Sequence, residues 1–236
     1  MPLFFRSDSM PSDQPEYVAW IDVMGIGPVM GRSLDIAANF IFKLHVSAVK
    51  ASASGLKLYP VMDGFYATAS RQQDMVAFLS TVFDQCAEEF IATPKEQFHH
   101  RFIIRGALAY GPVIHGQALP ASATQPPNGS DPFAANPAYK SSILIGLPMV
   151  QAHLSERKAP PFGLFVHESA RSFAPTGSEP LHFSWWKWTQ QNSQRWTNLY
   201  DELIDYFGRC RSHAMPIEYE EARIDLHEKM TKQYFM

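Results

Sequence analysis

The sequence of 236 residues predicts an α+β fold, with helices on one face of a mostly antiparallel sheet. Three observations favour this fold class. Apolar runs of strand length recur along the N-terminal part of the chain. Two stretches between them repeat apolar residues at three- and four-residue steps, as a helix with one buried face requires. The dipeptide Asp63-Gly64 stands between two apolar runs, a pattern typical of a hairpin turn.

The first predicted element is a strand that begins at Tyr17 and ends in the turn Gly25-Ile-Gly-Pro28. From Val29, apolar residues recur at helical spacing as far as Leu44, and Gly55 ends this helix. We therefore expect a glycine-containing turn to lead directly into one helix.

A hairpin, a second helix and a long strand follow. The runs 56–62 and 65–69 form the hairpin around Asp63-Gly64, which places Asp63 at its tip. Residues 74–92 carry apolar positions in helical register, and residues 98–110 are predicted as a strand. Beyond them the sequence predicts a helix over 138–157, a strand over 163–166, and helices over 192–211 and 217–232.

The chain divides into three parts. Residues 1–16 are polar and proline-containing, and we expect a flexible N-terminus there. Residues 17–168 form the main domain. Residues 169–236 are predicted as an aromatic-rich helical extension, whose tryptophans pack its helices onto the core.

Composition excludes several function classes. A net charge of −3 and a pI near 6.3 argue against a basic face for nucleic acid. The sequence shows no signal peptide and no apolar run of membrane-spanning length, so we expect a cytoplasmic protein without a membrane partner. Cys86 and Cys210 fit no zinc-ligand spacing, although one disulfide remains possible. Histidines such as His115 are expected to be structural.

Two aspartates carry the chemistry. Asp22 ends the first strand and Asp63 lies at the hairpin tip, so neighbouring strands bring the two carboxylates together. Two carboxylates at such short distance repel each other unless divalent cations lie between them. A pair of metal ions is a known arrangement for displacement reactions at phosphorus. Because all the ligands are oxygens, we expect two Mg²⁺ or Mn²⁺ ions per site.

A phosphate site is predicted beside the aspartates. Gly25, Ile26 and Gly27 form a turn in which small residues let backbone amides approach an anion, and the following helix directs its positive end there. A triphosphate is the ligand that suits both features.

These residues resemble the class III nucleotidyl cyclases. Asp22-Val-Met-Gly-Ile-Gly27 is similar to their first-strand stretch, Met62-Asp63 to their hairpin, and the strand from Arg105 to Gly116 to their Arg-containing strand that ends in Gly-Pro-Val-x-x-Gly. The resemblance covers roughly residues 17 to 167. It implies a ferredoxin-like cyclase homology domain that works as a homodimer, with active sites at the interface.

The resemblance also implies roles for individual residues. Asp22 and Asp63 would bind both metal ions, and the carbonyl of Val23 would bind one of them. Arg105 is a candidate to contact phosphate, so the implied catalytic residues are Asp22, Asp63 and Arg105. A strand arginine in an ordinary salt bridge is the alternative for Arg105.

The sequence departs from the family at three positions. Met149 and His153 stand where adenylate and guanylate cyclases have a transition-state asparagine and arginine, so either another group acts or the site is inactive. Tyr59 replaces the purine-recognising lysine. A tyrosine leaves room for a pyrimidine, although a strand aromatic packed in the sheet is the alternative.

This pattern resembles the pyrimidine cyclases of the bacterial Pycsar antiphage systems. It implies conversion of UTP to 3′,5′-cyclic UMP and pyrophosphate, with CTP and cyclic CMP as the close alternative, and a separately encoded effector that responds to the product. A cyclase-shaped module that binds nucleotide without turnover is the competing hypothesis. A diguanylate cyclase is disfavoured because the hairpin reads Val61-Met-Asp-Gly-Phe65 and lacks the GGDEF-type signature.

Overall fold

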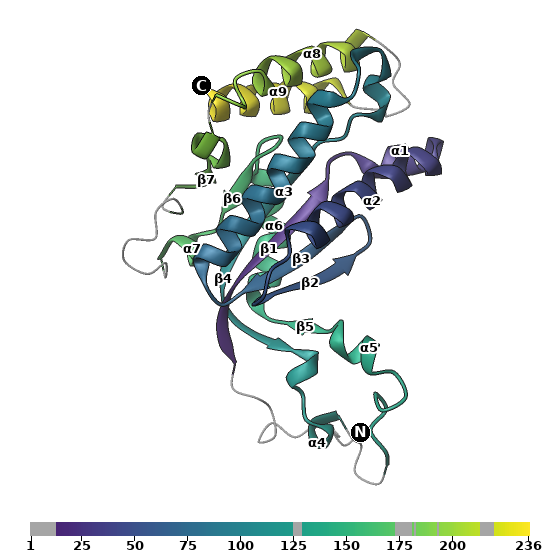
Figure 1. Ribbon diagram of the computed structural model, residues 1–236, viewed down its shortest axis with the longest axis vertical. Helices are drawn as coiled ribbons and strands as arrows, with labels where there is room; N and C mark the ends of the chain where they lie inside the picture. Colours follow the sequence, from purple (N-terminus) through teal and green to yellow (C-terminus); the bar gives the residue numbers. More distant parts are fainter. Residues whose placement is uncertain (1–12, 125–128, 173–180, 182, 193, 213–219) are drawn as a thin grey trace.

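The computed structural model describes residues 13–124, 129–172, 181, 183–192, 194–212 and 220–236 (Figure 1). Seven strands of the described chain form one sheet, in the order β2-β3-β1-β4-β6-β7 with β5 also paired to β4. Among these described strands β4 and β6 run parallel, and the other pairs are antiparallel. The strands are β1 (Gln14–Val23), β2 (Leu56–Val61), β3 (Gly64–Ala69), β4 (Ile104–His115), β5 (Leu144–Ile145), β6 (Leu164–Val166) and β7 (Trp185–Trp186).

The first four strands and two long helices have the ferredoxin-like order βαββαβ. The helices α2 and α3 lie side by side across one face of the sheet (Figure 1). The predicted α+β, ferredoxin-like fold with a mostly antiparallel sheet is thereby confirmed. The α-helices are α1 (Ile26–Arg32), α2 (Leu34–Ala51), α3 (Gln72–Ala92), α4 (Ala121–Thr124), α5 (Pro137–Ser141), α6 (Leu147–Ser155), α7 (Glu168–Ser172), α8 (Leu199–Ser212) and α9 (Glu221–Phe235).

The central strand β1 separates two apolar clusters, because successive side chains point to opposite faces. Tyr17, Ala19 and Ile21 pack with α2 and α3 in the main core. Val18 and Trp20 belong to a smaller cluster on the other face. The helix α6 covers part of that second face through Ala152 and Met149. The prediction that helices cover one face is therefore incomplete.

The N-terminal elements differ from prediction in their bounds. The strand β1 begins at Gln14 rather than Tyr17, because residues 14–16 pair with the second half of β4. The predicted helix from Val29 is two helices that meet at Ser33. Ser33 is extended, with φ −149° and ψ 99°, and it caps the start of α2: its hydroxyl accepts a hydrogen bond from the amide of Ile36.

Two later predictions also shift. A 3₁₀ turn occupies Lys95–His100, and the strand β4 follows it from Ile104 to His115 rather than over 98–110. The predicted helix over 138–157 is interrupted, because Leu144 and Ile145 pair with the end of β4 and extend the chain between α5 and α6. The predicted strand over 163–166 appears as β6.

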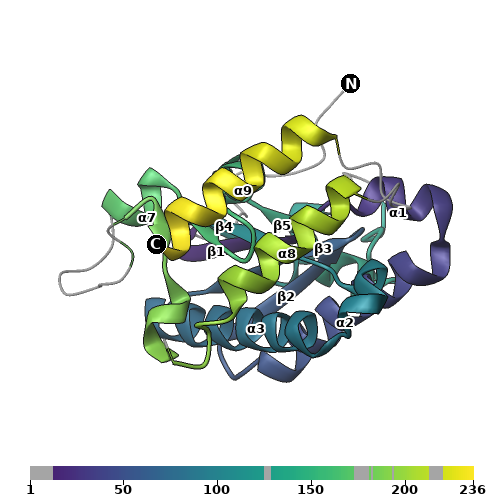
Figure 2. The same cartoon turned by 90° about the horizontal axis from the view of Figure 1, so that it is seen from above.

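The described part of the C-terminal extension packs against the core. Trp186, Trp188 and Trp196 are buried in the main cluster. The indole nitrogen of Trp188 donates a hydrogen bond to the carbonyl oxygen of Phe162 at 2.7 Å. The helices α8 and α9 lie side by side near one end of the sheet, with α9 on the side of α8 away from α3 (Figure 2). Their bounds begin later than the predicted 192–211 and 217–232.

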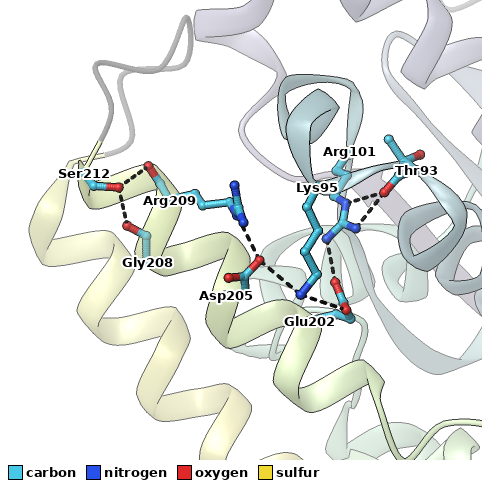
Figure 3. Close-up of polar contacts among 8 residues, drawn as sticks. All are labelled: Thr93, Lys95, Arg101, Glu202, Asp205, Gly208, Arg209 and Ser212. Carbon is cyan, nitrogen blue, oxygen red and sulfur yellow. Dashed lines mark hydrogen bonds and ion pairs between the residues drawn. The ribbon is translucent and has the colours of Figure 1, made fainter.

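A buried arginine, Arg101, links helix α8 of this extension to the core (Figure 3). Arg101 is 2% exposed and donates two hydrogen bonds to the carbonyl oxygen of Thr93, at 3.0 and 2.6 Å. Its third nitrogen donates to Glu202 of α8 at 2.9 Å. Lys95 lies 3.2 Å from the same glutamate. Glu202 therefore compensates a charge that would otherwise be buried without an anionic partner.

Both cysteines are free and buried, so no disulfide joins them. Burial raises the pKa of the Cys86 thiol to about 12 and that of Cys210 to about 11. No helix in the described ranges combines the length and the apolar character needed to cross a membrane.

We predict that Glu202→Ala lowers the free energy of unfolding by about 3 kcal/mol, because it leaves the Arg101 charge buried without its carboxylate. Urea denaturation measures the change. The control is Arg71→Ala, which breaks an exposed pair with Asp74 and should cost less than about 1 kcal/mol. Equal losses in the two variants would contradict the role given to Glu202.

Candidate functional site

Asp22 lies at the end of β1, between two neighbouring strands. Its partners in register are Gly64 of β3 and Arg105 of β4. Because side chains alternate along the strand, its carboxylate shares a face with Trp20, on the side away from α2 and α3. Its Oδ1 atom is buried and has no hydrogen-bond partner in the described chain. An unsatisfied carboxylate oxygen in this position is costly for a protein that does not use it.

The surroundings of Asp22 oppose its charge. Burial, followed by the negative charges of Asp63 and Glu156, raises the pKa of Asp22 to about 7 from the usual 3.8. Arg105 and a backbone hydrogen bond from Val23 act in the other direction and are outweighed. The site therefore holds a carboxylate that becomes fully charged near neutral pH only when a further positive charge arrives.

Asp63 lies in the two-residue turn between β2 and β3, where it is partly buried. The turn consists of Met62 and Asp63, rather than the predicted Asp63-Gly64, and Met62 adopts a left-handed conformation with φ 49°. Gly64 instead begins β3, where a Cβ would lie 2.4 Å from the carbonyl oxygen of Ile21. The glycine is thus required by close strand packing opposite Asp22, and the predicted place of Asp63 at the hairpin tip is retained.

The donor set suits a divalent ion that binds together with a phosphate. No cluster of three or more His, Cys, Asp or Glu side chains arranged to hold a metal occurs in the described ranges. Mg²⁺ rarely needs such a cluster, because it is usually bound by one or two carboxylates, water and substrate phosphates. The buried Oδ1 of Asp22, the nearby Asp63 and the carbonyl of Val23 are the residues that would hold it.

Arg105 is the partner of Asp22 in register on β4, and it is in a salt bridge, as the alternative predicted; its contact with phosphate stays a prediction. Its Nε donates to the carboxylate of Glu156, which follows α6 and is 5% exposed. Its Nη1 lies 3.4 Å from Nε2 of His227 in α9. The two interpretations are therefore compatible, because the ion pair fixes the arginine next to the aspartate.

The glycine turn leads into α1, as predicted. Gly25 is left-handed, with φ 70°, and precedes the seven-residue helix without a side-chain cap. Ile26 is buried in the main core, and a side chain at Gly27 would meet nothing within 4 Å. Because α1 is short, phosphate binding by Gly25, Ile26 and Gly27 stays a prediction.

Tyr59 belongs to the second apolar cluster and is 4% exposed. Its hydroxyl is 2.5 Å from Nδ1 of His115, and Nε2 of that histidine is 2.9 Å from the carboxylate of Glu16. The three side chains form one hydrogen-bonded chain, in which both ring nitrogens of His115 have partners. A contact between Tyr59 and a base stays a prediction.

Two of the three positions that differ from the cyclase pattern are Met149 and His153, beside the second apolar cluster. Met149 packs against the second apolar cluster. The ring of His153 lies edge-on to Trp20, with the ring centroids 5.2 Å apart. Apart from this contact the His153 side chain is exposed, whereas Met149 is partly buried.

Sequence reasoning missed Glu156 and His227. Both are buried charged or polar residues within reach of Arg105. Glu156 lies just beyond a helix and His227 lies 122 residues after Arg105, so no local pattern links them to the aspartates. A buried polar side chain on the apolar face of α9, beside Ile224, was the one available signal.

No family model matches the sequence, and no curated protein matches it. Several solved structures are similar in part, and two of them are described here. One is an adenylate/guanylate cyclase/hydrolase from Silicibacter pomeroyi, with 13% identity and a TM-score of 0.46 over 72% of this chain and 85% of that one. The other is a bacterial light-regulated adenylyl cyclase, with 12% identity and a TM-score of 0.44 over 66% of this chain and 44% of that one. These similarities are too distant to assign an activity.

We predict that the metal-free protein loses stability as pH rises from about 4 to about 7. The pKa of Asp22 is raised to about 7, so the folded state holds a proton that the unfolded state has already released over this range. Thermal melting of the wild type and Asp22→Asn tests this. The variant should melt at the higher temperature at pH 8, and the difference should vanish near pH 4.

Asp35→Asn is the matched control, because Asp35 is exposed in the first turn of α2. Its melting temperature should follow that of the wild type across the same pH range. A constant offset between the wild type and Asp22→Asn would show that the Asp22 charge is not the cause.

Proposed function

We propose that this protein is a nucleotidyl cyclase that converts UTP to 3′,5′-cyclic UMP and pyrophosphate with the help of two divalent ions. The observation that supports the proposal best is the unpartnered, buried Oδ1 of Asp22, next to Asp63 and Arg105. A second aspartate that raises the pKa of the first is destabilising unless a cation joins the two. Mn²⁺ or Mg²⁺ is the cation that such oxygen ligands prefer.

In this proposal the chain supplies binding and orientation. Asp22 and Asp63 hold the ions from adjacent strands, with the carbonyl of Val23 as a further oxygen ligand. When bound, the ions would favour ionisation of the ribose 3′-hydroxyl and stabilise charge on the α-phosphate. The 3′-oxygen forms a bond to the α-phosphorus, the bond to the pyrophosphate oxygen breaks, and the hydroxyl proton leaves to solvent. Arg105 donates a hydrogen bond to the phosphate.

The choice of a pyrimidine rests on Tyr59. A tyrosine occupies more of the base pocket than an extended lysine, which disfavours a purine. Its hydroxyl is held by His115, so the position of the oxygen is fixed. Because a tyrosine oxygen both donates and accepts, it is compatible with uracil and with cytosine. CTP is therefore the alternative substrate.

The biological setting is proposed from the same resemblance. The enzyme would act as a cytoplasmic homodimer in bacterial antiphage defence, with metal ligands from one chain and base contacts from the other. Its product would activate a separately encoded effector.

A second candidate function is nucleotide binding without turnover. Met149 and His153 favour it, because they stand where other cyclases have an asparagine and an arginine, and Met149 packs against the second apolar cluster. Both candidate functions predict that the protein binds nucleotide, but only the cyclase predicts that it forms a product.

We expect the purified protein with Mn²⁺ to release pyrophosphate from UTP and form cyclic UMP, as identified by chromatography against parallel incubations with CTP, ATP and GTP. Asp22→Ala and Asp63→Ala should each lower turnover by at least about a thousandfold while the far-ultraviolet circular dichroism stays unchanged. Asp35→Ala is the exposed control. Activity that survives in either site variant overturns the metal-site proposal.

The other nucleotides separate the alternatives. A cyclic purine product would overturn the argument from Tyr59. Nucleotide affinity without any product from the four nucleotides would favour the binding module.

Tyr59→Phe should lower kcat/KM for UTP about tenfold, because the pocket loses one hydrogen bond to the base. The control is Tyr66→Phe, since Tyr66 is the cross-strand partner of Tyr59 and belongs to the same cluster. Steady-state kinetics with both variants measures the effect. Equal losses would show that Tyr59 acts through packing alone.

A further inference from the structure

Arg105 is held by residues from two distant parts of the chain. Its Nε donates to Glu156, and its Nη1 lies 3.4 Å from Nε2 of His227. The remaining nitrogen, Nη2, has no partner in the described chain. The guanidinium is therefore fixed through two of its nitrogens, and the third remains for a ligand beside Asp22, its neighbour in register.

His227 can accept a hydrogen bond from Arg105. It lies in α9 and is 8% exposed. Burial, followed by the positive charges of Arg105 and Arg223, lowers its pKa to about 4, so the imidazole is neutral at the pH of a cell. A neutral imidazole has one acceptor nitrogen, and Nε2 takes that role when it faces an arginine N–H.

Glu156 is poorly explained by stability. A buried ion pair contributes little to stability compared with apolar residues of the same volume. Its negative charge also raises the pKa of Asp22, and this repulsion lowers the stability of the folded protein when Asp22 is charged. A fold with no use for a charge at this position has no reason to keep it there. The hydrogen bond from Arg105 to Glu156 indicates that the glutamate serves to orient the arginine.

The position of α9 is itself fixed. The hydroxyl of Tyr234 donates to the carbonyl oxygen of Trp186 in β7 at 2.6 Å. Ile224 is 1% exposed in the main core. These two anchors lie on either side of His227 along the helix, so its imidazole is held in place relative to the sheet.

We propose that His227 and Glu156 are positioning residues that orient Arg105 toward the phosphate of the substrate, so that the C-terminal extension completes the cyclase site. This inference rests on the proposed function and goes beyond it. It assigns the extension a part in catalysis, in place of the transition-state residues whose positions Met149 and His153 occupy.

The test compares His227→Leu with His227→Gln in the full-length protein. Leucine keeps the volume and removes the acceptor, whereas the glutamine carbonyl restores an acceptor near the position of Nε2. We expect kcat for UTP to fall about tenfold or more in His227→Leu, with KM changed less than about threefold, and to recover in His227→Gln. Ile224→Val is the control for lost packing in α9, and its kcat should equal that of the wild type.

A second readout does not depend on turnover. The side-chain N–H signals of Arg105 in nitrogen-edited NMR spectra of the metal-free protein should be sharp in the wild type and in His227→Gln. In His227→Leu they should broaden or exchange faster with water.

The outcomes are distinguishable. An active wild type whose kcat is unchanged in His227→Leu overturns this inference and leaves the proposed function intact. A loss of kcat in His227→Leu that glutamine does not rescue shows a merely structural histidine and also overturns it. A wild type that is inactive with all four nucleotides overturns the proposed function, and this inference falls with it.

Discussion

The buried carboxylate of Asp22 is the constraint on which the rest of the site depends. Within the described residues its Oδ1 has no hydrogen-bond partner, and Asp63 and Glu156 add negative charge around it. Such an arrangement lowers the stability of the metal-free protein, which must be offset elsewhere. The main core, on the other face of the sheet, is a continuous apolar cluster of strands and helices that supplies the compensating burial.

The two faces of the sheet therefore have different compositions. The face under α2 and α3 is apolar. The opposite face combines a small apolar cluster with buried polar chains, one from Tyr59 through His115 to Glu16 and one from Glu156 through Arg105 to His227. Buried polar chains rigidify a structure when each member is satisfied. Rigid orientation is what a site needs if it aligns a ribose hydroxyl with a phosphate.

The C-terminal extension links the core to the site around Arg105. Arg101 and Glu202 fasten α8 to the core through a buried ion pair, and α8 packs against α9. The helix α9 then brings His227 to Arg105. The extension therefore does more than bury its tryptophans, because it contacts Arg105, the partner of Asp22 in register.

The sequence by itself determined the ferredoxin-like order of elements, the strand-end positions of Asp22 and Asp63, and the packing role of the tryptophans, because these follow from local periodicity and turn residues. Apolar periodicity alone did not reveal the break at Ser33, where a local side-chain cap starts a new helix. Strand pairing and close packing decided the one-residue shift of the hairpin turn at Met62 and the interruption of the 138–157 helix. Only the tertiary structure brought Glu156 and His227 to Arg105. Contacts between residues so distant in sequence are set by how whole helices dock, and no short window of sequence contains that information.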